Sequence, residues 1–130
     1  MTTKIIGTGS YLPEYVVTND DLAKLVDTSD EWIASRTGIR NRRIATSESG
    51  VDMAAAAAEE ALKDAGMDGS EIDLILVATC SSDFQFPSTA CLVQKAIHAT
   101  NAAAFDLSAA CSGFLFALHT AYAYICAGDL

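Results

Sequence analysis

Hydrophobic positions along the chain change their spacing several times, and each spacing predicts a type of element. Residues 72–77 form a nearly continuous apolar run, and residues 102–107 form a shorter one around a single aspartate. Such runs are typical of strands buried on both faces, as in a parallel sheet. Residues 4–12 are predicted to form a strand that ends in a turn at Pro13, and residues 39–45 a charged, half-buried strand.

Capping residues predict two short helices near the start of the chain. Thr18 and Asp21 are spaced as a helix cap and its third residue, and Thr28 and Glu31 repeat that spacing as a capping box. Gly38 is expected to end the second of these helices, because glycine readily takes the left-handed backbone conformation found there.

Longer helices are predicted between the apolar strands. An alanine-rich helix over residues 52–65 is capped by Ser49 and stopped at Gly66, and a further helix runs from Ser88 to about residue 97. Strands and helices therefore alternate along the chain. We predict an α/β fold in which helices cover a mostly parallel sheet.

The last apolar segment, residues 113–127, predicts a buried core helix. His119 and three hydroxyl-bearing residues interrupt it, and it is shorter than the roughly 18–20 residues that cross a bilayer. The first residues lack the long apolar stretch of a secretory signal. We therefore expect a cytoplasmic protein with no membrane partner.

Charge changes this picture only locally. The net charge of −9 disfavours binding to nucleic acid, whose phosphates attract basic surfaces. All the arginines nevertheless fall in one short stretch, as Arg36, Arg40, Arg42 and Arg43. This island has two interpretations that the sequence leaves equal: a site for an anionic ligand or acidic partner, or a solvated loop that balances nearby Asp30 and Glu31.

Four cysteines, at positions 80, 91, 111 and 126, show no CxxC pair, and the two histidines do not complete a metal-binding pattern. We expect no metal site and no disulfide. Cys80, Cys91 and Cys126 are predicted to be small buried residues.

Cys111 differs from the other cysteines because it lies at the junction between a predicted strand and the helix that follows it. Ligands of α/β folds bind at the carboxyl ends of strands, and a helix N-terminus favours the thiolate form of a cysteine. Ala109, Ala110 and Gly113 keep this turn small, so a substrate can approach, and the backbone N–H groups can hold an oxyanion. A reactive thiol and a buried small residue both remain open on these grounds.

Two aromatic features suggest contacts with other molecules. Trp32 and Arg36 lie four residues apart, on one face of a helix, and form a plausible platform for a nucleotide through stacking and phosphate pairing. The alternative is a core tryptophan beside an unrelated surface arginine. Phe84 and Phe86 lie on a connecting loop, where they are expected to pack against another subunit or a ligand.

Several stretches together resemble the ketoacyl-ACP synthase III family of thiolase-fold condensing enzymes. They are IIGTGSYLPE, TSDEWIASRTGIRNRRIA, FPSTACLVQ and AFDLSAACSGFLFAL, which extend from near the start to the end of the chain. The resemblance implies an enzyme of fatty acid biosynthesis. Its cysteine takes an acyl group from acyl-CoA, such as acetyl-CoA, and condenses it with malonyl-ACP, releasing CoA and carbon dioxide and forming a 3-oxoacyl-ACP.

The resemblance also implies roles for individual residues. Cys111 matches the acylated nucleophile, and Thr28, Trp32 and Arg36 match residues that hold the adenine end of coenzyme A. Coenzyme A is then a substrate, and no tightly bound cofactor is expected. Phe86 matches a phenylalanine that reaches across a homodimer to the partner's acyl pocket. The remaining expectations concern an acyl pocket near Leu107 and docking of the acidic carrier protein on Arg40, Arg42 and Arg43.

One departure from the family pattern concerns the histidine and asparagine that complete its catalytic trio. His98 and His119 do not lie in matching motifs, and His119 is roughly 12 Å along its helix from Cys111. Both are interpreted as structural. We therefore expect residues 1–130 to be part of the N-terminal thiolase-like half, with the C-terminal half absent from this chain, and we expect the fragment alone to be inactive.

Three other hypotheses remain. A related thiolase-fold acyltransferase, such as a hydroxymethylglutaryl-CoA synthase or a plant-type polyketide synthase, uses another acyl donor or acceptor. A non-catalytic CoA-binding subunit needs no thioester on Cys111. A doubly wound phosphate-binding domain is disfavoured, because Leu12 occupies the third glycine position of the GxGxxG pattern.

Overall fold

The computed structural model describes residues 3–128 and divides the chain into two compact units. One unit is Leu12–Glu48, and the other joins the described parts of Met1–Tyr11 and Ser49–Leu130. The units are treated separately below. Residues 1, 2, 129 and 130, which belong to the expected thiolase-like segment, lie outside the described residues.

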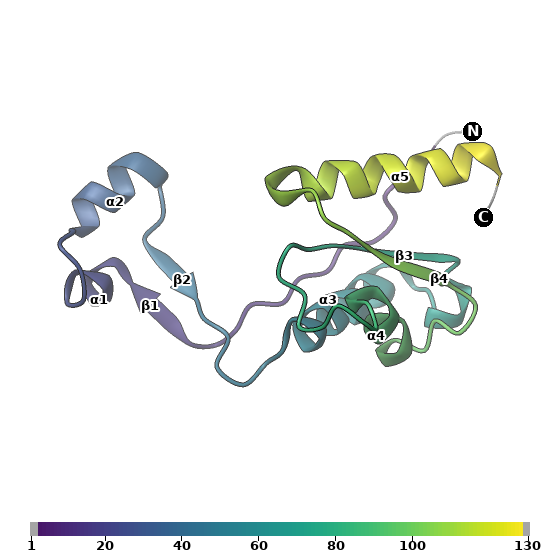
Figure 1. Ribbon diagram of the computed structural model, residues 1–130, viewed down its shortest axis with the longest axis horizontal. Helices are drawn as coiled ribbons and strands as arrows, with labels where there is room; N and C mark the ends of the chain where they lie inside the picture. Colours follow the sequence, from purple (N-terminus) through teal and green to yellow (C-terminus); the bar gives the residue numbers. More distant parts are fainter. Residues whose placement is uncertain (1–2, 129–130) are drawn as a thin grey trace. The chain divides into compact units, whose positions relative to one another are not determined.

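The unit Leu12–Glu48 pairs two short helices with a small hairpin-like sheet. Strand β1 (Val16–Thr18) pairs antiparallel with β2 (Asn41–Arg43), and helices α1 (Asn19–Ala23) and α2 (Asp30–Thr37) lie between them in sequence (Figure 1). Residues 39–45 were predicted to form one strand, but only the central residues Asn41–Arg43 are in a strand, which pairs with β1.

The larger unit is built around two parallel strands. Strand β3 (Leu74–Ala78) pairs with β4 (Ala103–Leu107), with Leu74 opposite Ala103. Helices α3 (Gly50–Ala65) and α4 (Thr89–Ala96) lie on one face of this pair, and α5 (Gly113–Ala127) lies on the other (Figure 1). Two 3₁₀ turns, Gly69–Glu71 and Ala110–Ser112, precede β3 and α5. The α/β prediction and the parallel pairing are confirmed.

The core of the larger unit lies between α4 and the strands. Val93, Ile97, Ala99 and Ala102 are buried together, and seven partly buried apolar residues pack against them: Val51, Ala54, Ala58, Leu62, Ile72, Ile75 and Val77. These residues come from α3, from β3 and from the segment before β3. The strands β3 and β4 themselves are only half-buried, so the prediction of strands buried on both faces is wrong for the described residues.

Helix α3 has the predicted cap and stop, Ser49 and Gly66, although it begins at Gly50 rather than at residue 52. The Ser49 hydroxyl accepts a hydrogen bond from the Asp52 backbone N–H at 3.1 Å, and the Asp52 carboxylate accepts one from the Ser49 N–H at 2.9 Å. Gly66 ends the helix in the left-handed conformation, with φ of 67°. A reciprocal cap and a glycine stop thus define the long alanine-rich helix.

The segment before Leu12 is extended but is not a strand, so that prediction is wrong. Its backbone N–H groups bond to carboxylates of α3 rather than to a neighbouring strand: Thr8 donates to Asp64, and Ser10 donates to Glu60. Gly9 lies so close to α3 that an added Cβ atom would be 2.1 Å from the Ala57 carbonyl oxygen. Glycine here permits close packing on a helix.

Helix α2 begins one residue later than predicted. Its cap is Ser29, whose hydroxyl accepts from the Trp32 N–H at 3.1 Å, and not Thr28. Ser29 has the extended backbone of a cap residue, with φ of −146° and ψ of 160°. The two adjacent hydroxyl residues made both positions possible in the sequence, and the backbone conformation selects the second. Gly38 ends the helix as predicted.

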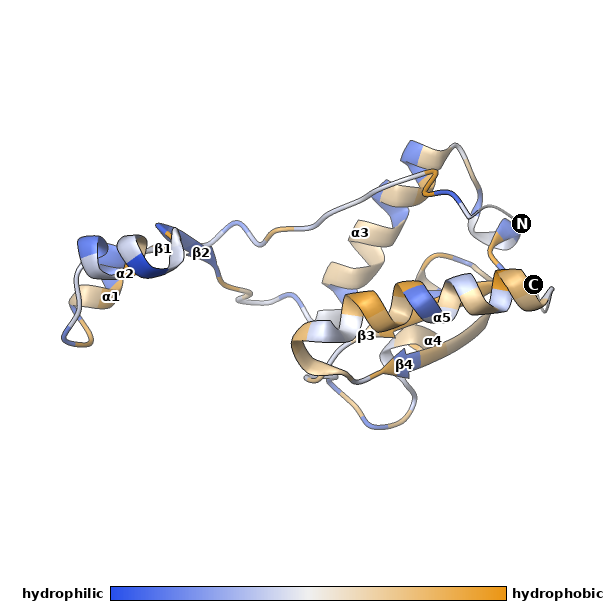
Figure 2. Ribbon diagram, turned by 90° about the horizontal axis from the view of Figure 1, so that it is seen from above, coloured by the Kyte–Doolittle hydropathy of each residue, from blue (hydrophilic) through white to orange (hydrophobic). Residues whose placement is uncertain are grey.

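Helix α5 departs most from expectation, because most of its apolar side chains are exposed in this chain. Of its residues only Gly113 is buried, while Phe114 is 70% exposed. Figure 2 shows that much of this helix is coloured as hydrophobic. The preceding 3₁₀ turn lengthens the apolar stretch to the 18 residues Ala110–Ala127, with a mean hydropathy of 1.3. By length and composition alone this stretch is sufficient to cross a membrane, so the length-based exclusion was wrong. Core helices of soluble proteins meet the same criterion.

An open apolar groove of 790 Å³ adjoins α5 in the larger unit. Its lining includes Leu62 of α3, Ile75 of β3, and Phe114 and Leu118 of α5. The exposed face of α5 is therefore continuous with a hollow that is also apolar.

Candidate functional site

Cys111 lies in the 3₁₀ turn that joins β4 to α5. The turn is closed by backbone hydrogen bonds from Ser112 to Ala109, at 3.0 Å, and from Gly113 to Ala110. Ala110 has a φ of 45°, a conformation that costs a residue with a Cβ atom about 1–2 kcal/mol. The Cys111 side chain is exposed. The chain thus holds an accessible thiol on a strained turn at the carboxyl end of a strand.

The first turn of α5 has no side-chain cap, and a small residue lies at its start, as the sequence predicted. The Ser112 side chain makes no capping hydrogen bond to the first turn of the helix. Gly113 lies against β3, since an added Cβ atom would be 3.1 Å from the Ala78 Cβ. The small residue therefore lets the N-terminus of α5, with its partial positive charge, begin beside the strand ends.

A second hollow, of 390 Å³, lies at the same strand ends and is partly polar. Cys80, Gln85, Asp106 and Ser108 are among its lining residues, and the Cys80 sulfur is 3.6 Å from the Ser108 hydroxyl oxygen. These residues follow or end β3 and β4, so the carboxyl edge of the parallel pair gathers polar groups near the Cys111 turn.

Asp106 connects this edge to α4. Its two carboxylate oxygens accept hydrogen bonds from the backbone N–H groups of Thr89, at 2.9 Å, and Ala90, at 2.7 Å. The carboxylate thus satisfies orphan donors at the start of α4 from a neighbouring strand. Site prediction missed this residue, although an aspartate within the apolar run 102–107 was a visible signal.

The three other cysteines are not buried. Cys80, Cys91 and Cys126 are exposed in the described part of the chain, so the prediction of buried small residues is wrong. Two of these three cysteines have a polar side chain next to the sulfur. The Ser88 hydroxyl donates to the Cys91 sulfur at 3.2 Å, and Cys80 lies beside Ser108.

The loop before α4 presents its aromatic residues to solvent. Phe86 is 92% exposed and Phe84 is also exposed, so neither finds an intramolecular packing site in the larger unit. Ser88 caps α4 as predicted, accepting from the Cys91 N–H at 3.3 Å. Leu107, the predicted acyl-pocket residue, is half-buried at the end of β4.

Trp32 and Arg36 form the predicted platform on α2. The Arg36 guanidinium carbon is 4.4 Å from the centroid of the Trp32 ring, within the range of a cation–π contact. Trp32 is 54% exposed, so its ring is available to a flat ligand and is not a core residue. Thr28 is half-buried, just before the Ser29 cap.

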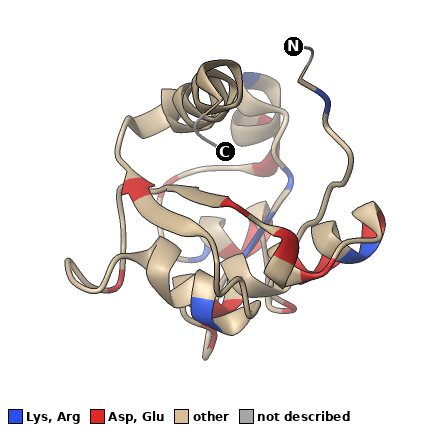
Figure 3. Cartoon of the chain, turned by 90° about the vertical axis from the view of Figure 1, so that its right-hand side faces the viewer, with Lys and Arg blue, Asp and Glu red and all other residues tan. Residues whose placement is uncertain are grey.

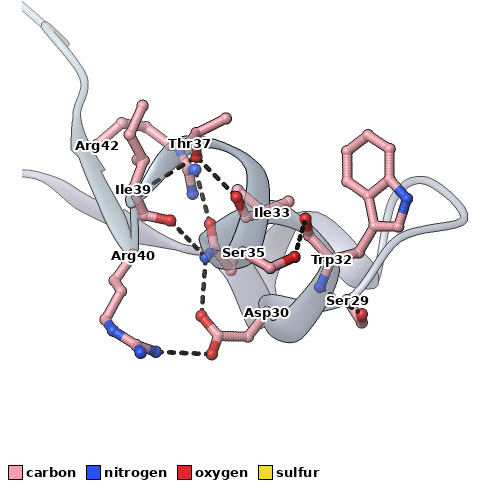
Figure 4. A network of polar contacts seen from close by, with 10 residues as sticks. Ser29, Asp30, Trp32, Ile33, Ser35, Thr37, Ile39, Arg40 and Arg42 are labelled. Atoms are coloured by element: carbon pink, nitrogen blue, oxygen red, sulfur yellow. Dashed lines mark hydrogen bonds and ion pairs between the residues drawn. The ribbon is translucent and has the colours of Figure 1, made fainter.

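The remaining arginines have partners within the smaller unit. Arg40 forms an ion pair with Asp30 at 2.9 Å (Figure 4). Arg42 donates to the Asn19 side chain at 2.7 Å. Arg43 donates to the backbone carbonyl oxygens of Pro13 and Glu14. The charge-balancing interpretation therefore holds for Arg40. The docking of a carrier protein on these arginines stays a prediction.

Acidic residues are spread over helices, strands and loops rather than gathered in one place (Figure 3). The two histidines lie in different segments of the larger unit, His98 after α4 and His119 on α5. His119 is near Tyr122 on α5, with ring centroids 6.4 Å apart, and His98 follows α4 with a φ of 57°.

Comparisons with known proteins give a consistent match. The family model for 3-oxoacyl-[acyl-carrier-protein] synthase III matches residues 105–130, the region that contains Cys111. A β-ketoacyl-[acyl-carrier-protein] synthase III of Clostridium acetobutylicum is 57% identical over 98% of this chain, which covers 39% of that relative. By sequence, the chain matches a segment of the synthase III family.

Solved structures extend the match to the fold. The crystal structure of synthase III from Aquifex aeolicus gives a TM-score of 0.95 with 57% identity, over 98% of this chain and 41% of that one. A priming β-ketosynthase from the R1128 polyketide pathway gives a TM-score of 0.85 with 43% identity, over 88% and 35%. The chain has the thiolase-like fold and spans about 40% of the length of the synthase III relatives it matches.

Proposed function

We propose that the full-length protein is a β-ketoacyl-ACP synthase III, which starts fatty acid synthesis, and that Cys111 is its acylated nucleophile. The observation that carries the proposal is the place of Cys111 in a chain 57% identical to synthase III. The thiol is exposed on a strained turn at the uncapped N-terminus of α5. A thiolate and an oxyanion are both stabilised by such a helix end.

The proposed reaction has two stages. The Cys111 thiolate attacks the carbonyl carbon of an acyl-CoA, a sulfur–carbon bond forms, and coenzyme A leaves as its thiol after taking a proton. Malonyl-ACP then loses carbon dioxide, and the resulting enolate attacks the Cys111 thioester. That step forms the new carbon–carbon bond of the 3-oxoacyl-ACP and releases the Cys111 thiolate. The histidine and asparagine that assist decarboxylation are assigned to the part of the protein outside this chain.

Substrate and partner sites follow from the same proposal. Trp32 and Arg36 hold the adenine and phosphate end of coenzyme A, with Thr28 beside them, and this is supported by their 4.4 Å contact and by the exposed ring. Leu107 lies near the acyl pocket, and Phe86 reaches into the partner of a homodimer, which is supported by its 92% exposure. The enzyme acts in the cytoplasm with no tightly bound cofactor.

Intact-mass analysis of the full-length protein before and after incubation with acetyl-CoA tests the proposal. We expect a gain of one acetyl group, mapped to Cys111, and no gain in Cys111→Ala. Cys80→Ala is the matched control, because Cys80 is another exposed thiol at the strand ends. Acetylation that persists in Cys111→Ala contradicts the assignment of the nucleophile.

A second candidate function differs in the product rather than in the chemistry. The match to a polyketide priming ketosynthase, at 43% identity, is consistent with the same thioester serving a polyketide rather than a fatty acid. Condensation assays with carrier proteins of each kind separate the two, since both begin with acylated Cys111. A non-catalytic CoA-binding subunit forms no thioester and fails the mass measurement.

A further inference from the structure

Asn19 is the largest side chain that is fully buried in the described part of the chain, with 1% of its surface exposed. It is the first residue of α1, in the unit that carries Trp32 and Arg36. A buried amide requires hydrogen-bond partners for its donors and its acceptor, because unpaired groups are costly away from water. Its partners therefore show what the residue holds in place.

The side-chain nitrogen, the side-chain oxygen and the backbone N–H of Asn19 all have partners outside α1. Its side-chain nitrogen donates to the Asp30 carboxylate and to the Ile39 carbonyl oxygen, both at 2.8 Å. Its side-chain oxygen accepts from Arg42 at 2.7 Å, and its backbone N–H donates to the Arg40 carbonyl oxygen at 3.2 Å. One amide thus connects α1 to the first turn of α2 and to the segment that enters β2.

Asp30 transmits this connection to the platform. One carboxylate oxygen accepts from Asn19. The other pairs with Arg40 at 2.9 Å (Figure 4). Asp30 is the first residue of α2, and Trp32 and Arg36 follow it on the same helix. The network therefore fixes the N-terminal turn of the helix that carries the ring and the guanidinium.

No large buried apolar side chain replaces this polar anchor in α2. None of its residues is buried, and Trp32 is exposed. The helix has eight residues, too few to be stable by itself in water. Ile33 and Ala34 are only half-buried, so the hydrogen bonds of Asp30 with Asn19 and Arg40 contribute to holding the first turn of the helix in place.

We propose that Asn19 is a positioning residue for the nucleotide end of acyl-CoA: it acts through Asp30 to hold Trp32 and Arg36 in place before the substrate arrives. This inference rests on the proposed function. A platform that is already ordered loses less conformational entropy on binding, so the affinity for the nucleotide rises. Asn19 does not touch the reacting atoms, and the chemistry at Cys111 does not depend on it.

The test compares two acyl donors in the full-length protein. Acetyl-CoA carries the nucleotide, whereas S-acetyl-N-acetylcysteamine carries the same thioester without it. In Asn19→Ala, we expect the KM for acetyl-CoA to rise about tenfold, equivalent to about 1.4 kcal/mol of binding free energy. We expect kcat and the KM for the truncated donor to stay within about twofold of wild type.

Thr18→Ala is the matched control for general destabilisation. Thr18 caps α1 next to Asn19, through bonds to Asp21 only, so its loss weakens the same unit without reaching α2. Its KM for acetyl-CoA should remain near wild type even where its melting temperature falls as far as that of Asn19→Ala. An equal rise in both variants, or an equal loss for both donors in Asn19→Ala, overturns the inference.

A second pair of variants keeps the test decisive if Asn19→Ala does not fold. Asp30→Ala removes the acceptor on α2 and should raise the KM for acetyl-CoA but not the KM for the truncated donor. Asp30→Asn retains an oxygen that can accept from Asn19, so its KM for acetyl-CoA should lie close to that of wild type. An Asp30→Ala variant with unchanged KM contradicts the inference. Trp32→Ala distinguishes failure of the proposed coenzyme A platform from failure of the positioning role. If Trp32→Ala leaves the KM for acetyl-CoA unchanged, the platform itself is contradicted. If Trp32→Ala raises that KM but Asn19→Ala does not, only the positioning role of Asn19 is contradicted.

Discussion

Gly9 is a residue whose importance comes from the absence of a side chain. An added Cβ atom would lie 2.1 Å from the Ala57 carbonyl oxygen and 2.5 Å from the Ala61 backbone nitrogen, both part of α3. We expect Gly9→Ala to lower the free energy of unfolding by about 1–3 kcal/mol, because backbone atoms of a helix cannot move aside cheaply. Urea denaturation followed by circular dichroism measures the change.

Gly50→Ala is the control for that substitution. The atom nearest to a Cβ atom at Gly50 would be an Asp83 carboxylate oxygen, at 3.3 Å, at the end of a side chain that can rotate. This change should leave stability within about 0.5 kcal/mol, or increase it slightly, because it removes a glycine from a helix. Similar losses in both variants would show that close approach to α3 is not what position 9 requires.

Single residues were predictable where chemistry and spacing coincide. The four-residue spacing of Trp32 and Arg36 predicted their contact. The change from a strand pattern to a helix pattern predicted that Cys111 lies in the turn between the two elements. Asn19 was not predictable, because its partners Asp30, Ile39 and Arg42 are 11–23 residues away in sequence. Long-range hydrogen bonds of this kind leave no local pattern.

Helix α1 depends on its cap more than on its five residues. The Asp21 carboxylate accepts from Lys24 at 2.7 Å, from the Thr18 hydroxyl at 2.7 Å and from the Thr18 N–H at 3.1 Å. These bonds, with Lys24 the largest cause, hold the pKa of Asp21 far below its ordinary value of 3.8. The capping box is therefore a pH-dependent element.

The sign of that dependence follows from the lowered pKa of the folded state. Above pH 3.8 the carboxylate is ionised in both states and its stabilising bonds are fully present. As the pH falls further, the unfolded chain takes up the proton first, so stability is lost. We expect Asp21→Asn to flatten the decrease of the melting temperature between about pH 5 and pH 2.

Asp20→Asn is the comparison, because it removes a carboxylate from the same turn but outside the capping box. It should leave the pH profile close to wild type. A profile that Asp21→Asn does not change would mean that the cap contributes nothing at acid pH.

Elements were predicted well where caps and apolar runs agree, as in α3, α4, β3 and β4. Prediction failed where the partner decides the element. Residues 4–12 read as a strand, yet the N–H groups of Thr8 and Ser10 bond to carboxylates of α3 instead of to a strand. The choice between Thr28 and Ser29 as a cap likewise depended on backbone angles that no sequence pattern fixes.

At the scale of the whole molecule, the apolar face of α5 sets the behaviour of the 130-residue chain. Phe114, Leu115 and Phe116 are exposed next to an apolar groove of 790 Å³. Exposed apolar patches drive association in water. We expect this chain alone to bind an apolar fluorescent dye and to self-associate as its concentration rises, as measured by analytical ultracentrifugation.

Phe116→Gln should reduce both effects, whereas Leu25→Gln, which removes an even more exposed apolar side chain from the other unit, should not. A chain that stays monomeric at high concentration with background dye fluorescence would contradict this expectation. The apolar composition of residues 113–127 predicted a core helix, but composition could not predict what covers it.

The division of the chain has a consequence for how such a protein can evolve. The unit Leu12–Glu48 is one continuous stretch of the chain. The other unit consists of the segments that precede and follow it. The proposed nucleotide platform lies wholly in the inserted stretch, and the cysteine turn lies wholly outside it. Recombination at the two boundaries of Leu12–Glu48 would therefore exchange the proposed nucleotide platform as one piece and leave the sequence of the Cys111 turn unchanged.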